Sequence, residues 1–297
     1  MNAYVISVIL GIIEGLTEFL PVSSTAHLRI AEALMHIGLA DPYWKMYTIV
    51  IQLGAILSLF FYFGPRIAKF LSTFPRGERG DRTALTHPLS LVIVAFVVTA
   101  IPSLFLVKVI GKHLESLEVM GISLIAGGVV MWIVDAINAK SEAAGPGAPG
   151  SRIRTWHMEE MTFGQAVWIG LCQICSGVFP GTSRSMSTIS GGQIVAMSRA
   201  SALEFSFFVS IPVMIAATGY DLLKSAVGKG PNPVGVSGIN AHGWGVLAVG
   251  FVVSFIVAYA AVAWFMAWVR RHGFVPFAMY RIVAGALVLI YMSRLAG

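Results

Sequence analysis

The chain has 297 residues, of which 57% are hydrophobic and only 11% carry a charge. Soluble globular proteins carry roughly 25% charged residues, so this composition excludes a soluble protein and indicates an integral membrane protein. The net charge is +6, but the basic residues lie mostly in short segments between apolar runs. That distribution favours a topology signal over nucleic-acid binding, and we expect no nucleic-acid partner.

The N-terminal segment is not an ordinary membrane span. An apolar helix over Val5–Phe19 reaches Pro21, passes through small hydroxyl residues and resumes as a short helix over Thr25–Ile37. Proline removes a backbone donor and biases the preceding residue away from helical geometry. Because a broken backbone at membrane depth is tolerated only inside protein or beside a wet cavity, we expect a re-entrant hairpin over residues 5–37. The segment lacks a basic start and a cleavage site, so we do not expect a removable signal peptide.

Six further apolar runs are near the ~20 residues that a helix needs to cross a membrane. Three precede and three follow the Gly/Pro-rich segment Ser141–Ser151, which we expect to be a flexible linker. The predicted spans are Tyr47–Phe63, Leu89–Val107, Met120–Ala139, Phe205–Leu223, Val246–Val269 and Phe277–Leu295. Before the last three lies a second broken helix, Phe163–Gly177 then Ser185–Met197, predicted as a re-entrant hairpin over residues 163–197.

The basic loops predict how the chain crosses the membrane. Gly64–Pro88 holds five Lys or Arg residues and Arg270–His272 is also basic, so both are expected on the cytoplasmic side. Counting spans places Lys140–Glu160 on the same side and the weakly charged loop Gly228–Gly243 outside. The first hairpin then has its ends outside and the second has its ends inside, so the two three-span units must be inverted.

The two broken helices are related in sequence. Residues 11–27 (GIIEGLTEFLPVSSTAH) and residues 170–186 (GLCQICSGVFPGTSRSM) overlay without a gap at a separation of 159 residues, which pairs Ser24 with Ser183. We therefore predict one membrane domain over residues 1–297, with repeat one at 1–140, a linker at 141–160 and repeat two at 161–297. The copies differ in their polar chemistry, since one carries carboxylates and a histidine and the other carries an arginine.

Glu14 and Glu18 are one helical turn apart, so they share a helix face. Ionisable side chains at membrane depth are costly and mark functional sites by default. Two neighbouring carboxylates suit a divalent metal, an arginine partner or a shared proton for acid–base chemistry. The sequence leaves these three alternatives open, beside a purely structural pairing.

The segment PVSSTAH, from Pro21 to His27, supplies three hydroxyl groups and an imidazole at a helix start. Each of the hydroxyl residues Ser23, Ser24 and Thr25 is also a plausible helix N-cap. Ser24 and His27 are three residues apart, so their side chains can meet. There the histidine could activate the hydroxyl or attack phosphorus itself.

The segment PGTSRSMST, from Pro180 to Thr188, is predicted to bind an anion. Gly181 allows close backbone approach, and N–H groups at a helix N-terminus favour phosphate. Arg184 adds a forked cationic donor suited to bidentate phosphate contact, although it could also merely neutralise the carboxylates. Further hydroxyl donors are Thr182, Ser183, Ser185 and Thr188.

The two cysteines form a C-x-x-C pattern at Cys172 and Cys175. In a redox protein this pattern would accompany a soluble βαβ unit. Here it lies in an apolar segment without metal-binding companions. We interpret both as small buried residues rather than as a redox or metal pair.

These motifs resemble a known family, the undecaprenyl-diphosphate phosphatases that recycle the bacterial lipid carrier for cell-wall synthesis. The resemblance rests on EGLTEFLPVSSTAH (residues 14–27) and PGTSRS (residues 180–185), with weaker matches at 52–57, 204–212 and 280–285 in order along almost the full chain. Met186 departs from the glycine that the family usually has at that position.

The resemblance implies an all-α membrane protein with six transmembrane helices and two re-entrant hairpins in an inverted-topology repeat. It implies a homodimer in the bacterial inner (plasma) membrane that hydrolyses a C55 isoprenyl diphosphate and thereby gives bacitracin resistance. It also implies a divalent cation, Mg²⁺ or Ca²⁺, and a site open to the periplasmic side. By motif position, Glu14 and Glu18 are the essential carboxylates, Ser24 and His27 the catalytic pair, and Arg184 the diphosphate-binding arginine.

We therefore predict a membrane phosphatase that releases phosphate and undecaprenyl phosphate, with a divalent cation on Glu14 and Glu18. Ser24 is the predicted nucleophile with His27 as its base, a phospho-histidine at His27 is second, and direct attack by water is third. Substrate-binding residues are expected to be Ser23, Thr25, Gly181, Thr182, Ser183, Ser185 and Thr188. The alternative is a membrane transporter or lipid-carrier flippase, because inverted repeats with broken helices are a transporter architecture.

Overall fold

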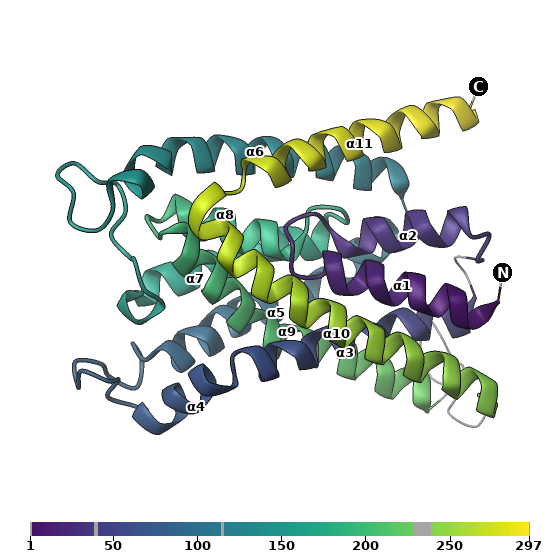
Figure 1. Cartoon of the computed structure of the whole chain (residues 1–297), viewed down its shortest axis with the longest axis horizontal. Coiled ribbons are helices and arrows are strands. Elements are labelled where there is room, and N and C mark those ends of the chain that lie inside the picture. Colours follow the sequence, from purple (N-terminus) through teal and green to yellow (C-terminus); the bar gives the residue numbers. More distant parts are fainter. Residues whose placement is uncertain (1, 39–40, 114–115, 228–238, 297) are drawn as a thin grey trace. The chain divides into compact units, whose positions relative to one another are not determined.

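The fold was obtained as a computed structural model of the chain, and it describes residues 2–38, 41–113, 116–227 and 239–296. These residues form helices joined by turns (Figure 1). The helices are α1 (Ala3–Thr17), α2 (Ser24–Leu34), α3 (Pro42–Tyr62), α4 (Gly64–Thr73), α5 (Pro88–His113), α6 (Leu117–Ala144), η1 (Met158–Glu160), α7 (Phe163–Val178), α8 (Arg184–Ile194), α9 (Arg199–Ala226), α10 (Ala241–His272) and α11 (Val275–Ala296). The prediction of an all-α protein is confirmed.

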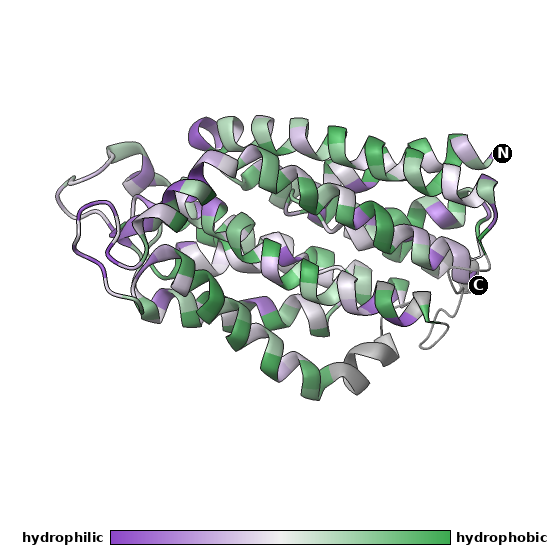
Figure 2. Ribbon diagram, turned by 90° about the horizontal axis from the view of Figure 1, so that it is seen from below, coloured by the Kyte–Doolittle hydropathy of each residue, from purple (hydrophilic) through white to green (hydrophobic). Residues whose placement is uncertain are grey.

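Six of the described helices are long and apolar enough to cross a membrane, namely α3, α5, α6, α9, α10 and α11. They coincide with the six predicted spans, and most extend by several residues at one or both ends. Hydrophobic residues run along the helices and hydrophilic residues gather in the connecting segments (Figure 2). This distribution is what a bilayer requires, because an apolar helix satisfies all of its backbone hydrogen bonds internally.

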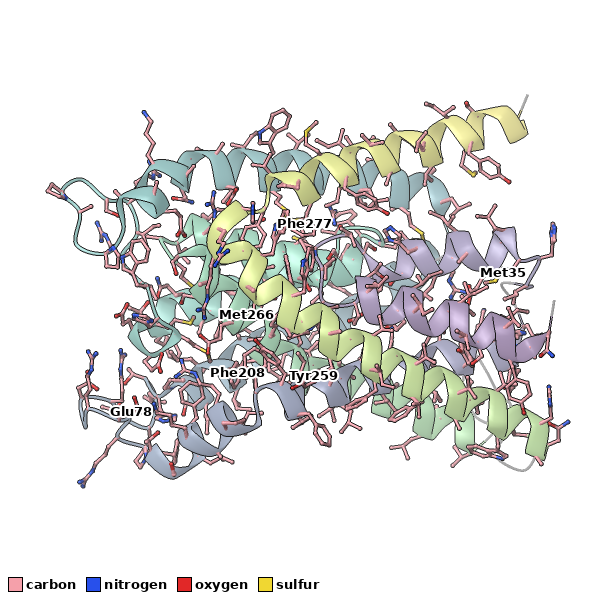
Figure 3. The ribbon with its side chains drawn as sticks, viewed as in Figure 1. Met35, Glu78, Phe208, Tyr259, Met266 and Phe277 are labelled. Carbon is pink, nitrogen blue, oxygen red and sulfur yellow. The ribbon has the colours of Figure 1, made fainter. Side chains whose placement is uncertain are left out.

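Two loop predictions need correction. Gly64–Pro88 is not loop throughout, because Gly64–Thr73 forms α4. This short helix buries Phe70 against Phe208, with ring centroids 5.5 Å apart (Phe208 is labelled in Figure 3). The predicted linker Ser141–Ser151 begins inside α6, which continues to Ala144. Most of the predicted loop Gly228–Gly243 lies outside the described residues.

The two predicted broken helices are present as α1 followed by α2 and as α7 followed by α8. Ser23 and Ser183 immediately precede the second helix and have left-handed φ values of 73° and 70°. His36 and Ala196 follow that helix with φ values of 57° and 65°. Both pairs are 160 residues apart rather than 159, since the second turn holds one extra residue. The structural counterpart of Ser183 is therefore Ser23 and not Ser24.

Contacts divide the chain into two compact units, which are described separately. Unit 1 comprises Met1–Leu20, Ser24–Gly64 and Ser210–Trp264. Unit 2 comprises Pro21–Ser23, Pro65–Val209 and Phe265–Gly297.

Unit 1 holds α1 beside α2 and against α3 and α10 through buried polar contacts (Figure 1). The Ser7 hydroxyl donates to the Val246 carbonyl over 2.7 Å, and the Tyr47 hydroxyl donates to the Ser7 carbonyl over 2.8 Å. Gly15 allows the close approach of α1 to α10, since a Cβ there would lie 2.8 Å from the Ser254 carbonyl oxygen. These contacts fix the helix that carries Glu14.

Unit 2 packs α6 beside α11, and one buried carboxylate ties four segments together (Figure 1). Asp135 is fully buried and accepts two hydrogen bonds from Arg199, over 2.7 and 2.9 Å. Gln193 of α8 and the Phe274 backbone N–H donate to the same carboxylate over 3.0 and 3.1 Å. Four donors offset the cost of burying this charge, so α8 is held firmly where its C-terminal end meets α6.

Candidate functional site

Glu14 and Glu18 lie at the C-terminal end of α1. The Glu18 backbone N–H donates to the Glu14 carbonyl over 2.9 Å, so the helical geometry continues through Glu18. The two carboxylates therefore share one helix face, as the sequence predicts. Glu14 is 0% exposed, and Glu18 is half-buried.

Ser24 lies at the first position of α2, directly after the left-handed Ser23. Its hydroxyl donates to Glu18 Oε2 over 2.5 Å. A carboxylate at this distance can accept the proton of a hydroxyl that becomes a nucleophile. The structure thus gives Ser24 a proton acceptor that the sequence analysis assigned to metal binding.

His27 lies in the same first turn of α2, three residues after Ser24. The predicted neighbourhood of the two residues follows from this helical spacing. His27 is half-buried, whereas Thr25 is exposed.

The anion-binding segment lies in unit 2, at the turn between α7 and α8. Gly181 has a φ of 92°, and a Cβ there would lie 2.6 Å from the Met120 carbonyl oxygen, so only glycine fits. Ser183 caps α8, because its hydroxyl accepts from the Met186 backbone N–H over 3.4 Å. Arg184 is the first residue of α8. The first turn of a helix leaves N–H groups without intrahelical partners, so the predicted combination of a helix N-terminus and an arginine is present here.

The predicted hydroxyl donors of this segment differ in what they contact. Thr188 is 1% exposed, and its hydroxyl lies 2.6 Å from the Ser206 hydroxyl on α9. That contact makes Thr188 a packing residue between α8 and α9 in this structure. Ser185 is fully buried, and within the described residues its hydroxyl makes no hydrogen bond. Thr182 is buried and lines an apolar groove.

The apolar groove has a volume of about 440 Å³ and lies in unit 2. Ile122, Ala126 and Val130 of α6 form one wall, and Phe179 forms part of the other. The groove reaches Thr182 and so adjoins the anion-binding turn. Cys172 and Cys175 also line it, and Cys175 is exposed rather than buried as predicted.

Arg281 of α11 is a buried cation that the sequence analysis did not single out. It is 0% exposed, and its guanidinium donates to the carbonyls of Pro21, Gly181 and Thr182. These carbonyls belong to the two turns that interrupt the broken helices. A charged residue within an apolar span was the available signal.

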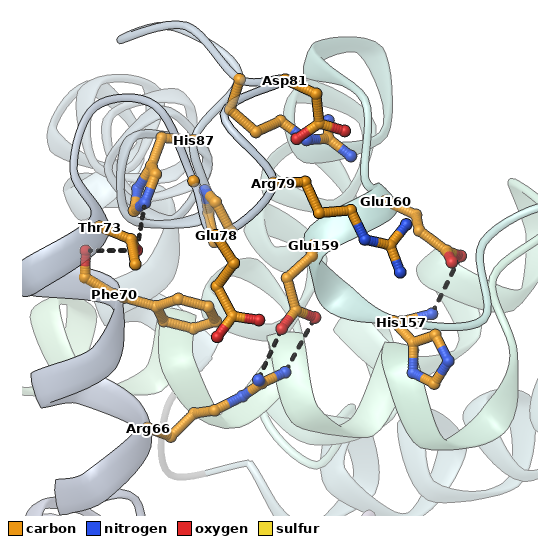
Figure 4. Close-up of a pocket in the computed structure, with 13 residues that line it drawn as sticks. Arg66, Phe70, Thr73, Glu78, Arg79, Asp81, His87, His157, Glu159 and Glu160 are labelled. Atoms are coloured by element: carbon orange, nitrogen blue, oxygen red, sulfur yellow. Dashed lines mark hydrogen bonds and ion pairs between the residues drawn. The ribbon is translucent and has the colours of Figure 1, made fainter.

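A polar pocket of about 180 Å³ lies elsewhere in unit 2, between α4 and η1 (Figure 4). Arg66 donates to Glu159 over 2.9 Å and to Glu204 over 2.8 Å. Burial opposes ionisation of Glu159, but the hydrogen bond from Arg66 outweighs it and holds the pKa of Glu159 below its ordinary value. None of the predicted site residues lines this pocket.

The protein groups available for a divalent cation are few. Within the described residues, no three or more His, Cys, Asp or Glu side chains gather into a metal-binding group. Mg²⁺ is usually held by one or two carboxylates together with substrate phosphates and water. Two carboxylates on one face of α1 fit an ion of that kind, whose remaining ligands come from substrate and water.

The geometry can be set beside known proteins. A sequence profile of the family described as "Bacitracin resistance protein BacA" matches residues 7–287. This chain belongs to the BacA family. The chain is 60% identical over 296 residues to an undecaprenyl-diphosphatase of Koribacter versatilis, covering 99% of this chain and 100% of the relative. It is 37% identical to an undecaprenyl-diphosphatase of Caldanaerobacter subterraneus, covering 99% of this chain and 98% of the relative.

A third BacA-family relative, the undecaprenyl-diphosphatase of Novosphingobium aromaticivorans, is 38% identical over 99% of both chains. These likenesses run through both helix breaks and all six apolar helices. The family resemblance stated from the motifs is therefore confirmed for the whole chain.

Proposed function

We propose that this protein is an undecaprenyl-diphosphatase, which hydrolyses undecaprenyl diphosphate to undecaprenyl phosphate and inorganic phosphate. The observation that carries the proposal is the full-length likeness to proteins of that name, at 60% identity for the Koribacter relative. A soluble or structural role is inconsistent with six apolar helices and a buried carboxylate. No observation favours the transporter or flippase alternative.

In the proposed reaction, Ser24 attacks the terminal phosphorus and Glu18 takes the hydroxyl proton. This choice of base follows from the Ser24–Glu18 hydrogen bond of 2.5 Å and replaces the earlier choice of His27. The Ser24 oxygen bonds to phosphorus while the bond from phosphorus to the bridging oxygen breaks, and undecaprenyl phosphate leaves. Water then hydrolyses the phosphoserine, which releases phosphate and returns the proton to Ser24. His27 is the second candidate nucleophile.

Arg184 and the α8 N-terminus are proposed to bind the diphosphate. A guanidinium can bind two phosphate oxygens at once, and helix N–H groups favour negative charge. Ser23, Thr25, Gly181, Thr182, Ser183 and Ser185 are retained as proposed substrate contacts. For Thr188, the Ser206 contact supports an indirect role through packing.

A divalent cation, Mg²⁺ or Ca²⁺, is proposed to act with Glu14 and Glu18. When bound, it would neutralise charge on the phosphate oxygens. The residues' own part is to supply carboxylate oxygens on one helix face, which the continuous helical backbone from Glu14 to Glu18 supports.

The apolar groove beside Thr182 is proposed to hold the first part of the isoprenyl chain. Its volume of about 440 Å³ lies within the range of about 300–1,000 Å³ for ligand pockets. Almost all of its lining is apolar, and it begins at the anion-binding turn. Such a groove suits a ligand with an anionic head and a hydrocarbon tail.

We further propose that both broken helices are re-entrant hairpins in an inverted repeat. The matching left-handed residues 160 positions apart support a duplicated unit. The protein is proposed to lie in the bacterial inner membrane as a homodimer, with its active site open to the periplasmic side. Basic loops on one side of the spans support this orientation.

Phosphate release from undecaprenyl diphosphate by the purified full-length protein, with Mg²⁺ or Ca²⁺ present, tests the function. Glu18→Gln and Arg184→Lys should each lower kcat/KM by about 10²–10⁴. Glu159→Gln and Arg154→Lys are matched controls from outside the site and should leave kcat/KM unchanged. No release by the wild-type protein, together with substrate uptake into vesicles, would favour the transporter alternative.

A diphosphate labelled on its terminal phosphorus tests the nucleophile in the same preparation. Rapid quenching should place the label on the peptide that contains Ser24. Label on His27 would assign the attack to the imidazole, and no labelled protein during turnover would assign it to water.

A further inference from the structure

Arg281 contacts both turns that interrupt the broken helices. One guanidinium nitrogen donates to the Pro21 carbonyl over 3.0 Å. The other donates to the carbonyls of Ser123, Gly181 and Thr182 over 3.2, 3.1 and 2.9 Å. All four acceptors are backbone atoms of unit 2. A single side chain thus binds the turn before α2 and the turn before α8.

The arginine is closely enclosed. A Cβ on Gly127 would lie 2.4 Å from the Arg281 guanidinium, so α6 has glycine where the guanidinium passes. Within the described residues, no carboxylate forms an ion pair with Arg281 and its Nε makes no hydrogen bond. Carbonyl dipoles are therefore what stabilises a cation that is 0% exposed. Such a costly arrangement calls for a reason beyond packing.

The contacts fix the direction of the peptide groups. In a planar trans peptide, the carbonyl and the following N–H point in opposite directions. Because the carbonyls of Pro21 and Thr182 point at Arg281, the N–H groups of Val22 and Ser183 point away from it. Ser183 caps α8, so its N–H belongs to the anion-binding end of that helix.

We propose that Arg281 is a positioning residue for the diphosphate. It does not touch the substrate but holds both turns so that their N–H groups face the phosphate oxygens. The inference rests on the proposed function, because the anion at the α8 N-terminus is taken to be the substrate diphosphate. Donors fixed before the reaction stabilise developing charge better than donors that must reorient.

Arg281→Lys is the first test, since it keeps the charge but loses the fork that reaches several carbonyls. We expect kcat/KM with undecaprenyl diphosphate to fall about 10²-fold, as when one preorganised donor is lost, mainly through kcat. Inorganic pyrophosphate serves as a probe that needs no turnover. It should raise the thermal unfolding temperature of the wild-type protein and raise that of the variant much less.

Gly127→Ala is the second variant, because its new methyl group displaces the guanidinium without removing the charge. It should show the same loss of kcat/KM and of pyrophosphate response. Arg199→Lys is the matched control, a structural arginine of unit 2 that binds Asp135. It should lower the unfolding temperature while leaving the pyrophosphate response intact.

The proposal is overturned if both Arg281→Lys and Gly127→Ala retain kcat/KM and the pyrophosphate response. It is also overturned if their only defect is a lower unfolding temperature. If the wild-type protein binds pyrophosphate through Arg281 but hydrolyses no undecaprenyl diphosphate, the proposed function fails and the positioning role stands.

Discussion

Glu18 shows how one contact redistributes roles among residues that a motif lists together. From the sequence, Glu18 pairs with Glu14 as a metal ligand and Ser24 pairs with His27. In the structure, Ser24 donates to Glu18 instead. The reason is the left-handed turn at Ser23, which starts α2 where its first side chain meets the end of α1. Residue spacing predicted which side chains are near one another, but not which of them share a hydrogen bond.

His87 gives a prediction of pH dependence. Burial lowers the pKa of His87 from its ordinary value, and the nearby charge of Arg82 lowers it further. Unfolded His87 titrates near its ordinary value of about 6.5, so as the pH falls through that value the unfolded chain takes up a proton that the folded chain refuses. The free energy of unfolding should therefore fall between about pH 7.5 and about pH 5.5.

Thermal unfolding in detergent at several pH values measures this effect. His87→Gln should flatten the decline, because the titrating group is gone. His242→Gln, at an exposed histidine, is the control and should leave the slope as in the wild-type protein. An unchanged slope in His87→Gln would rule out His87 as its source.

At the scale of elements, hydrophobic runs and proline predicted the helices well. All six spans and both broken helices are where composition and chain breakers place them. The sequence could not predict α4, whose basic residues made it read as loop although Phe70 anchors one face. It also missed the one-residue shift between Ser23 and Ser183, because a gapless alignment cannot register an extra residue in a turn.

The packing of α7 against α5 gives a prediction at this scale. A Cβ on Gly170 would lie 2.7 Å from the Ala95 carbonyl oxygen, whereas one on Gly164 of the same helix would meet nothing within 4 Å. Gly170→Ala should therefore cost about 1–3 kcal/mol of stability through overpacking. Gly164→Ala should be neutral or stabilising by up to about 1 kcal/mol, as is usual for helical glycine. Thermal unfolding measures both, and equal effects would contradict the close packing.

At the scale of the whole molecule, composition alone predicts where the protein resides. Large apolar side chains are exposed on the described helices, including Phe105 at 82% and Leu104 at 74%. Only a hydrocarbon surrounding makes such exposure favourable. The candidate site was less predictable, because Arg281 acts through backbone carbonyls and no sequence pattern marks the carbonyls that a distant side chain will bind.

The groove gives a prediction about the molecule in its lipid surroundings. Cys175 is exposed and lines the proposed chain-binding groove. In a Cys172→Ser background, undecaprenyl phosphate should slow maleimide labelling of Cys175, and a short-chain prenyl phosphate should slow it less. Mass spectrometry follows the labelling. A cysteine introduced at the exposed Leu104 is the control, and equal protection of both sites would indicate bulk lipid coverage instead.

The left-handed residues at both ends of α2 and α8 separate the scaffold from the chemistry. Ser23 and Ser183 set where each short helix begins, and His36 and Ala196 set where it ends. The residues that then occupy the first helical position are Ser24 in one copy and Arg184 in the other. A duplicated backbone can thus keep a fixed eleven-residue helix while a single substitution at its start turns a nucleophile's position into a cation's. Division of labour between the copies requires no change in the path of the chain.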